Sequence, residues 1–459
     1  MQMQVAVILA GGRGTKMWPY SEVRPKALIP ILNQPVLGML LKSLRNLNTS
    51  TIIVTGGYLG SQVEAYVSGQ SGVTYVDTAN CLGTAYALKK ALAGVTWDEC
   101  LVVYGDIVVD EADLKRLVQF RRDSGVAAAA LVTPIDGERP GDWICASVQG
   151  SSLKEVIGHP RGASHRMCGI YAITKEVSQY IWSASGSFRN VPVGMMPPVE
   201  SEIGDSIQAM IEAGVDVGAV ETQGYFVDLD KPWHILEATM ALGRYRSAAL
   251  KESSIHPTAR ISDKAEIKGH VVIGENSVIG PRTVINGNLW VGKDTIIDNG
   301  PILGGGVVIG DGCIIDDYCK INDGSVVGNR CKVRHGAELS GVIMDNVYLY
   351  HYMIISGVVG VSTDIGGGTM CGGLRFDDGE TVHVVKGRKE IPKEFANAVY
   401  IGDYCRTGIG AMIMPGCKIG SYSIVGSGVI LYDDLPSRTM VLAKQEIVTK
   451  PWGPEKYGW

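Results

Sequence analysis

An aliphatic residue recurs at every sixth position through the second half of the chain, and this repeat constrains the fold more than any other feature. The run begins at Ile255 and continues without exception to Leu339. A helix or an ordinary strand does not produce a period of six, whereas a hexapeptide β-solenoid does, with three six-residue sides closing each coil. The repeat slips by two after Leu339, resumes at Val347, and returns at Ile401 after an excursion over residues 374–398. We therefore expect an all-β solenoid whose aliphatic steps fill its interior.

Five of the ten cysteines fall in one slot of this repeat, four residues after an aliphatic step. At many other steps the same slot holds Ala, Ser or Thr, which indicates a preference for small side chains, and a free cysteine behaves as a small hydrophobe. These five are Cys313, Cys319, Cys331, Cys405 and Cys417. Because the chain has no C-x-x-C pair, we expect packed thiols rather than a metal site or a disulfide scaffold.

Residues 1–245 show a different pattern, in which short apolar runs alternate with helical periodicity. This alternation predicts an α/β domain with a mostly parallel, Rossmann-like sheet covered on both faces. The expected strands are Val5–Leu9, Thr51–Thr55, Val73–Val76, Cys100–Val103, Ala127–Thr133 and Gly169–Ile173, with helices such as Pro35–Leu47 and Ala85–Ala93 between them. We expect domains at 1–245 and 246–435 and a C-terminal tail at 436–459.

A glycine-rich loop follows the first expected strand. From Leu9 to Lys26 the chain reads LAGGRGTKMWPYSEVRPK, with three glycines in four positions. Glycines allow the backbone to approach a ligand closely, and their amides can point at a phosphate. The basic side chains that add positive charge to this segment are Arg13, Lys16, Arg24 and Lys26. No Gly-Lys-Ser/Thr closes a Walker loop, but the segment still predicts a nucleotide phosphate as its ligand.

This loop resembles the signature of sugar-1-phosphate nucleotidylyltransferases, GG-x-GTR-(M/L)-x-P…PK, with Lys16 in place of the usual arginine. The resemblance implies attack of a sugar-1-phosphate on a nucleoside triphosphate, giving a nucleotide-sugar (a UDP- or dTDP-sugar) and pyrophosphate. It implies catalytic roles for Arg13 and Lys26. It also implies nucleotide contacts for Leu9, Ala10, Gly11, Gly12, Gly14, Thr15 and Lys16, and for Gly83 and Thr84 of a Leu-Gly-Thr segment.

The same resemblance implies a Mg²⁺ ion held by two aspartates. Asp106 follows the strand Leu101–Val103, and Asp228 lies in the segment YFVDLDKPW. Asp230 stands where the family has glycine and competes with Asp228 for this role. Two carboxylates together with substrate phosphates are an ordinary way to hold Mg²⁺.

The segments that would contact the sugar phosphate depart further from the family pattern. Trp143-Ile144-Cys145, Gly158-His159-Pro160 and Met167-Cys168-Gly169 stand where the family has Tyr-Gly-Val, Glu-Lys-Pro and Asn-(Ala/Thr)-Gly. The resemblance places His159, Gly169 and Glu200 on the sugar-phosphate side. His159 or Arg161 would supply the positive charge of the missing lysine.

Over nearly its whole length the chain resembles the bifunctional archaeal type, a nucleotidylyltransferase followed by an acetyltransferase on a left-handed parallel β-helix. This implies acetyl-CoA as a co-substrate and a homotrimer or dimer of trimers. The family's catalytic histidine corresponds to His351 when counted from Ile343-Met344-Asp345, but to Tyr350 when counted back from Val359-Gly360. His351 therefore stays open between a general base and a structural residue.

Charge and hydropathy exclude several other classes of function. The net charge is −5, so nothing indicates a nucleic-acid partner, and no apolar run reaches membrane-spanning length. We expect a cytoplasmic protein with no membrane partner. The alternative to the enzyme is a catalytically silent paralogue that binds nucleotide or nucleotide-sugar as a regulatory or assembly subunit, which the altered sugar side favours.

Overall fold

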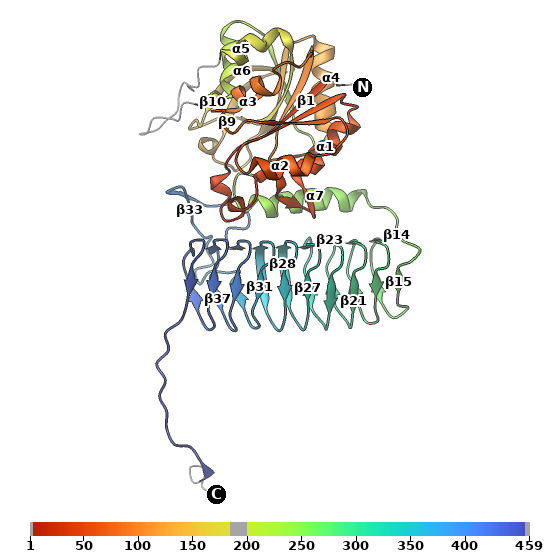
Figure 1. Ribbon diagram of the computed structural model, residues 1–459, viewed down its shortest axis with the longest axis vertical. Coiled ribbons are helices and arrows are strands. Elements are labelled where there is room, and N and C mark those ends of the chain that lie inside the picture. Colours follow the sequence, from red (N-terminus) through yellow and green to blue (C-terminus); the bar gives the residue numbers. More distant parts are fainter. Residues whose placement is uncertain (1–2, 184–199, 455–459) are drawn as a thin grey trace.

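The computed structural model describes residues 3–183 and 200–454 as an α/β domain stacked on a β-solenoid (Figure 1). The last helix of the first domain, α7 (His234–Ala249), lies along the solenoid and runs across residue 245, where we expected the boundary. Within the described part of the chain, no helix has the length and apolar character of a membrane span.

A nine-stranded sheet forms the centre of the α/β domain, in the order β5-β4-β1-β6-β11-β8-β12-β10-β9. Its strands are β1 (Val5–Ala10), β4 (Thr51–Gly56), β5 (Val73–Asp77), β6 (Glu99–Tyr104), β8 (Ala128–Pro134), β9 (Ile144–Gln149), β10 (Ser152–Gly158), β11 (His165–Thr174) and β12 (Val217–Glu221). The pairs β4–β5, β1–β4 and β1–β6 are parallel, whereas β11 runs antiparallel to β6, β8 and β9. The parallel pattern expected from the sequence thus describes one half of the sheet, and antiparallel pairs dominate the other.

Successive side chains of a strand point to opposite sides, so both faces of this sheet carry apolar side chains. Helices cover both faces. Ala6, Ile8 and Ala10 of β1 join the core under α1 (Val36–Asn46), α2 (Gly60–Val67) and α4 (Glu111–Ser124). Val5, Val7 and Leu9 join the core under α3 (Thr84–Ala91), α5 (Ser178–Trp182) and α6 (Ile203–Glu212). The strand β1 is therefore buried along its whole length, and its carboxyl end opens into the glycine loop.

The solenoid runs from β14 (Ser254–Ile255) to β41 (Met440–Val441), and most of its strands are two or three residues long. From β14 to β25 (Lys320–Ile321), each strand pairs in parallel with the strand 18 residues later, so three hexapeptides make one coil, as in Ile255↔Ile273 and Ile261↔Ile279. From Ile273 onward the aliphatic steps are buried inside, whereas Ile255 at the open end of the solenoid is exposed. Parallel coils built from hexapeptides are the architecture of the left-handed β-helix that we expected from the sequence.

The coil shortens where the sequence repeat slips. Val327 pairs with Ile343, only 16 residues later, within the long strand β28 (Glu338–Ile343). Leu349 and Ile355 then stand at the positions that pair with the aliphatic residues of the preceding coil. The register expected from the sequence, which put the step at Val347, is therefore wrong by two residues there, because β28 bends between two sides without the usual turn.

The cysteine prediction is confirmed for the solenoid. All ten cysteines are free, and the five that share the small-residue slot are at most 3% exposed. Burial raises the pKa of the Cys319 and Cys417 thiols to about 12, so these groups stay protonated and pack as small apolar side chains.

Contacts between the two domains begin in the segment that follows the glycine loop. The Tyr20 hydroxyl donates to the Val358 carbonyl oxygen at 2.8 Å, and Asn33 Nδ2 donates to the Val327 carbonyl oxygen at 2.7 Å. Arg24 forms an ion pair with the fully buried Asp403 of the solenoid. Arg24 is thus directed to the domain interface, and not to the phosphate loop where the sequence placed its charge.

Candidate functional site

The glycine loop meets Asp106 because two strand ends approach each other closely. Gly105, directly after β6, donates its N–H to the Leu9 carbonyl oxygen at 2.8 Å. A Cβ atom on Gly105 would lie 2.8 Å from the Ala10 Cβ atom, closer than side chains tolerate. The glycine therefore allows the end of β6 to pack against β1, which brings the Asp106 carboxylate beside the loop.

Lys26 reaches the same place from the far end of the signature segment. Gly14 has a φ of 61°, and a Cβ atom there would lie 2.5 Å from Lys26 Cγ, so the lysine stem packs directly over this glycine. Lys26 Nζ lies 2.5 Å from Asp106 Oδ2. Burial lowers the pKa of Lys26, but the charges of Asp106, Asp230 and Asp228 outweigh burial and hold that pKa above its usual range. Lys26 is therefore a fixed positive charge at neutral pH.

Asp228 is placed beside Asp106 by backbone pairing. It ends β13 (Phe226–Asp228), which pairs antiparallel with β7 (Ile107–Val109), and the next residue, Leu229, donates its N–H to the Asp106 carbonyl oxygen at 3.0 Å. Burial and the neighbouring Asp106 charge raise the pKa of the Asp228 carboxyl to about 7. Two carboxylates thus crowd one site.

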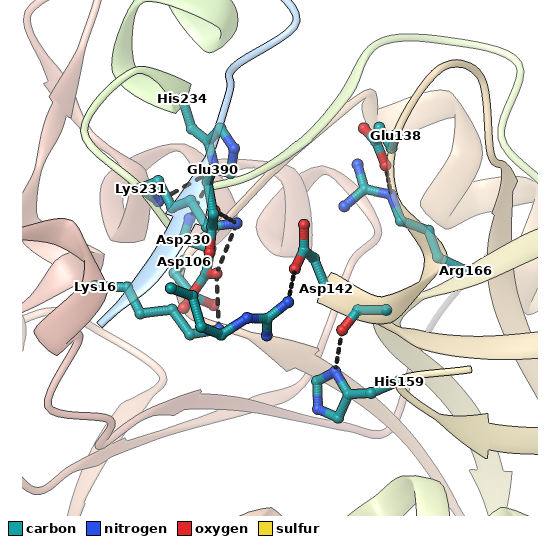
Figure 2. A network of polar contacts seen from close by, with 12 residues as sticks. Lys16, Asp106, Glu138, Asp142, His159, Arg166, Asp230, Lys231, His234 and Glu390 are labelled. Carbon is teal, nitrogen blue, oxygen red and sulfur yellow. Dashed lines mark hydrogen bonds and ion pairs between the residues drawn. The ribbon is translucent and has the colours of Figure 1, made fainter. Parts of the chain in front are cut away.

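Asp230 is surrounded by three lysines, as Figure 2 shows in part. Its carboxylate lies 3.1 Å from Lys16 Nζ, 3.9 Å from Lys26 Nζ and 3.7 Å from Lys231 Nζ. Burial alone would raise the pKa of Asp230, but these cations hold it below its usual range. Asp230 therefore acts as the shared counter-ion that positions Lys16 and Lys26, a role that the sequence did not indicate.

The pair Asp106 and Asp228 fits a divalent cation better than Asp230 does. Both are oxygen donors, and the pKa of Asp228 is raised by burial and then by the Asp106 charge, two effects that a bound cation would offset. Within residues 3–183 and 200–454, no three His, Cys, Asp or Glu side chains gather as a complete metal site. A metal here would take its remaining ligands from substrate phosphates and water.

Two further groups of the site were missed from the sequence. His234 Nδ1 accepts hydrogen bonds from the N–H groups of Asp230 and Lys231, at 3.0 and 3.2 Å. Burial, and then the charge of Lys231, lower the pKa of His234 to about 3, so it stays a neutral acceptor that fixes this turn. Lys231 Nζ lies 2.9 Å from Glu390 Oε2 of the excursion. The only sequence signal for this arrangement was the short separation of Asp230 and His234 along the chain.

Arg166 was also missed. It is 6% exposed on β11, its Cζ atom lies 4.0 Å from the Trp143 ring centroid, and its Nε atom lies 3.1 Å from Glu138 Oε2. The Trp143 ring also stacks on His234, with ring centroids 6.0 Å apart. An aromatic and cationic stack therefore stands where the sequence comparison expected sugar contacts.

The expected sugar-phosphate residues come from three different elements: His159 follows β10, Gly169 lies on β11, and Glu200 precedes α6. His159 Nδ1 donates to the Gly141 carbonyl oxygen at 3.1 Å, and burial, followed by the charges of Lys16 and Arg388, lowers its pKa. His159 is thus neutral at pH 7 and does not replace a lysine. Gly169 has a φ of 67° and faces the Tyr104 ring, while Glu200 is exposed near Glu202 on the way into α6.

The expected nucleotide residues occupy two adjoining segments. Leu9 and Ala10 are buried at the end of β1, whereas Gly12, Arg13 and Thr15 are exposed, and the loop therefore presents its amides and one free guanidinium outward. Gly83 and Thr84 start α3 against the chain before α6. There Thr84 Oγ1 donates to Glu202 Oε2 at 2.6 Å, and Gly83, with a φ of 100°, leaves no room for a Cβ atom beside the Ser201 backbone.

His351 lies away from these groups, on a turn of the solenoid between β29 (Tyr348–Leu349) and β30 (Ile354–Val359). Its side chain is exposed, and its Nδ1 atom lies 2.6 Å from Nδ1 of His335. One imidazole of this pair donates and the other accepts, so the two rings fix each other's tautomer. The nucleotide loop and His351 are therefore two separate candidate sites.

Comparison with known proteins relates both halves of the chain to transferases. The profile of the MobA-like NTP transferase domain matches residues 6–177, and the bacterial transferase hexapeptide profile matches residues 306–341 and 398–433. A protein of Methanococcus maripaludis named bifunctional protein GlmU is 30% identical over 449 residues, which are 96% of this chain and 98% of that protein. The chain belongs to the bifunctional GlmU family.

Other relatives of this GlmU-family chain are more distant. A bifunctional sugar-1-phosphate nucleotidylyltransferase/acetyltransferase of Sulfurisphaera tokodaii is 26% identical over 439 residues, covering 94% of this chain and 98% of that protein. A UDP-glucose pyrophosphorylase structure from Acinetobacter baumannii superposes with a TM-score of 0.45 and 18% identity, over 54% of this chain and 95% of that one.

Proposed function

We propose that the α/β domain transfers a nucleotidyl group from a nucleoside triphosphate to a sugar-1-phosphate and releases pyrophosphate. The observation that carries this proposal is the convergence of Lys26, Asp106 and Asp228 beside the glycine loop. Membership of the GlmU family supports the same reaction class.

The charge of each residue indicates its role in this reaction. The loop amides and the exposed Arg13 would hold the terminal phosphates, which leave as pyrophosphate. Lys26, which keeps its proton at neutral pH, would align the acceptor phosphate with the α-phosphorus. Phosphoryl transfer depends mainly on alignment and charge neutralisation, which these groups supply without a covalent intermediate. A Mg²⁺ ion held by Asp106 and Asp228 would add neutralisation of the α-phosphate charge.

A pyrophosphate-release assay over a panel of nucleoside triphosphates and sugar-1-phosphates tests this proposal. We expect turnover with at least one uridine or thymidine triphosphate pair, and loss of that turnover in Asp106→Asn. Nucleotide binding without turnover for any pair would instead favour the silent, nucleotide-binding paralogue.

We also propose that the solenoid transfers an acetyl group from acetyl-CoA to an amino-sugar phosphate, with His351 as the base. The observation that favours this second activity is the hydrogen bond between the Nδ1 atoms of His351 and His335. When His351 donates its Nδ1–H in this bond, its Nε2 atom keeps a lone pair that suits proton abstraction. Consumption of acetyl-CoA with glucosamine-1-phosphate or galactosamine-1-phosphate is the test. No consumption with either would contradict it.

Finally, we propose that the chain assembles through one side of its solenoid, as a trimer or a dimer of trimers. Four stacked strands of this side present exposed apolar residues at paired positions, namely Ile354, Met370, Met412 and Ile430, which are 39% to 48% exposed. A contiguous apolar ladder of this kind is typical of a protein interface. Light scattering of the wild type and of Met412→Glu tests it, with a smaller species expected for the variant.

A further inference from the structure

The excursion from the solenoid forms a hairpin that reaches the nucleotidyl site. Its strands are β33 (His383–Val385) and β34 (Arg388–Glu390), joined by Lys386-Gly387, and they extend from the solenoid toward the α/β domain (Figure 1). Between hairpin and domain lies a cavity of about 780 Å³. Its charged and titratable lining includes Lys16, Arg139, His159, Arg161, Lys386 and Arg388.

Successive side chains of the hairpin strands point to opposite faces, and only one of these faces is turned toward the α/β domain. Val385 is buried in the hydrophobic cluster that the α/β domain shares with the adjoining side of the solenoid, Glu390 pairs with Lys231 at 2.9 Å, and Arg388 Nη2 lies 2.7 Å from Asp142 Oδ1. Lys389 lies between Arg388 and Glu390 on the opposite face and is exposed. The hairpin is therefore anchored by three contacts on one face, while the other face is free.

The cavity carries more positive than negative charge. Five cationic side chains line it, and the one carboxylate among the lining residues, Glu390, is already paired with Lys231. Arg139, Arg161 and Lys386 have no carboxylate partner among the described residues. A set of unpaired cations around one cavity is suited to an anionic ligand.

Lys16 joins this cavity to the site of reaction. Its ammonium lines the cavity and also contacts Asp230, which in turn lies 3.9 Å from Lys26. If Lys26 aligns the 1-phosphate of the acceptor, as proposed above, the cavity lies on the other side of Asp230 and Lys16 from that phosphate. A second anionic group of the same acceptor would then meet the cationic cavity.

We propose that this cavity, built by both domains, binds a second anionic group of the acceptor, so that the substrate is a sugar-1-phosphate that also carries a carboxylate or a second phosphate. This proposal rests on the nucleotidyl transfer proposed above. It gives the hairpin of the solenoid a direct part in the reaction of the other domain.

The test compares acidic and neutral acceptors in the full-length protein. Galacturonic acid 1-phosphate and glucose 1,6-bisphosphate represent the two sources of the anion, and galactose-1-phosphate and glucose-1-phosphate are their neutral counterparts. We expect kcat/KM for one acidic acceptor to exceed that for its neutral counterpart. Lys386→Gln and Arg161→Gln should each reduce this ratio about fivefold, the effect of losing one exposed ion pair.

Lys389→Gln is the matched control, because it removes the same charge from the same hairpin on the face turned away from the cavity. It should leave the ratio as in the wild type. Equal loss in Lys389→Gln and Lys386→Gln would show a general field effect and overturn the proposal. Equal loss for acidic and neutral acceptors would also overturn it, because the cations would then serve the 1-phosphate.

Titration calorimetry separates this proposal from the proposed reaction. With EDTA present to prevent turnover, the wild type should bind galacturonic acid 1-phosphate or glucose 1,6-bisphosphate more tightly than the neutral counterpart, and Lys386→Gln should not. That result would support the cavity even if no nucleoside triphosphate is turned over. Equal affinity of the wild type for acidic and neutral sugar phosphates would contradict it.

Discussion

The nucleotidyl site and the corner around His351 differ in how many elements build them. In the first, groups from the ends of β6 and β13, the glycine loop and the hairpin converge. Burial and the mutual charges of these groups together shift the pKa values of Lys26, Asp228 and Asp230 away from the usual range. In the second, an exposed histidine has one partner, His335, on the neighbouring coil. Strong coupling between groups is typical of a site organised for charge stabilisation, whereas a lone oriented base provides proton transfer only.

The largest effect is expected for Asp106→Asn, which should separate the two sites completely. Removing this charge takes away the nearest ion-pair partner of Lys26. It also removes one of the two carboxylates that would hold the metal ion. We expect nucleotidyl transfer to fall about 10²- to 10³-fold, the size found when a charge-stabilising group is lost, measured as pyrophosphate release. Acetyl-CoA consumption should not change. A parallel loss of both activities would show that the two sites are not independent.

The interface between the regions can be broken at Arg24. Arg24→Ala leaves the buried Asp403 carboxylate without its cation, which should lower the free energy of unfolding by about 3 kcal/mol, measured by urea denaturation. Because neutral groups need no ion partner, Arg24→Ala with Asp403→Asn should recover most of this loss. If folded Arg24→Ala instead loses pyrophosphate release, Arg24 belongs to the phosphate site after all.

His351→Ala tests the candidate site on the solenoid separately from the nucleotidyl site. If His351 is the base, acetyl-CoA consumption should fall about 10²-fold, the usual contribution of a general base, while pyrophosphate release stays at the wild-type rate. His270→Ala, which removes another exposed solenoid histidine, is the control. Acetyl transfer that is equal in both variants would leave His351 as a structural residue.

The smallest effect concerns Glu237 of α7, between the two regions. Burial, and then the charges of Glu138 and Glu394, raise the pKa of Glu237 from 4.5 to about 7. Between these values the folded state holds a proton that the unfolded state has lost, so this group makes stability fall as pH rises from about 4.5 to 7. Glu237→Gln should remove that fall and gain about 1 to 3 kcal/mol at pH 8 relative to the wild type. Urea unfolding at pH 4 and pH 8 measures it; an unchanged difference between the two proteins would contradict the assignment.

Sequence reasoning identified residues that lie together in the structure where a feature is local, although their roles stay predictions. Asp106 and Lys26 were recognised because a glycine loop and a strand end carry their own signatures, and the structure places both side chains within 2.5 Å of each other. It failed for Arg166 and Lys231, which the pattern could not distinguish from ordinary charged residues of a strand and a turn. It also placed Arg24 at the phosphate loop, although that side chain faces Asp403, 379 positions away.

The sequence alone determined the solenoid and the glycine loop, because a six-residue period and a glycine-rich turn limit the backbone wherever they occur. Only the tertiary structure decided which side chains of the solenoid come to lie beside the α/β domain. The hairpin at residues 383–390 reaches Lys231 and Asp142 because the two domains pack in one particular way along α7. Such packing is the sum of many contacts between residues far apart in the chain, and no short segment carries a signature of it.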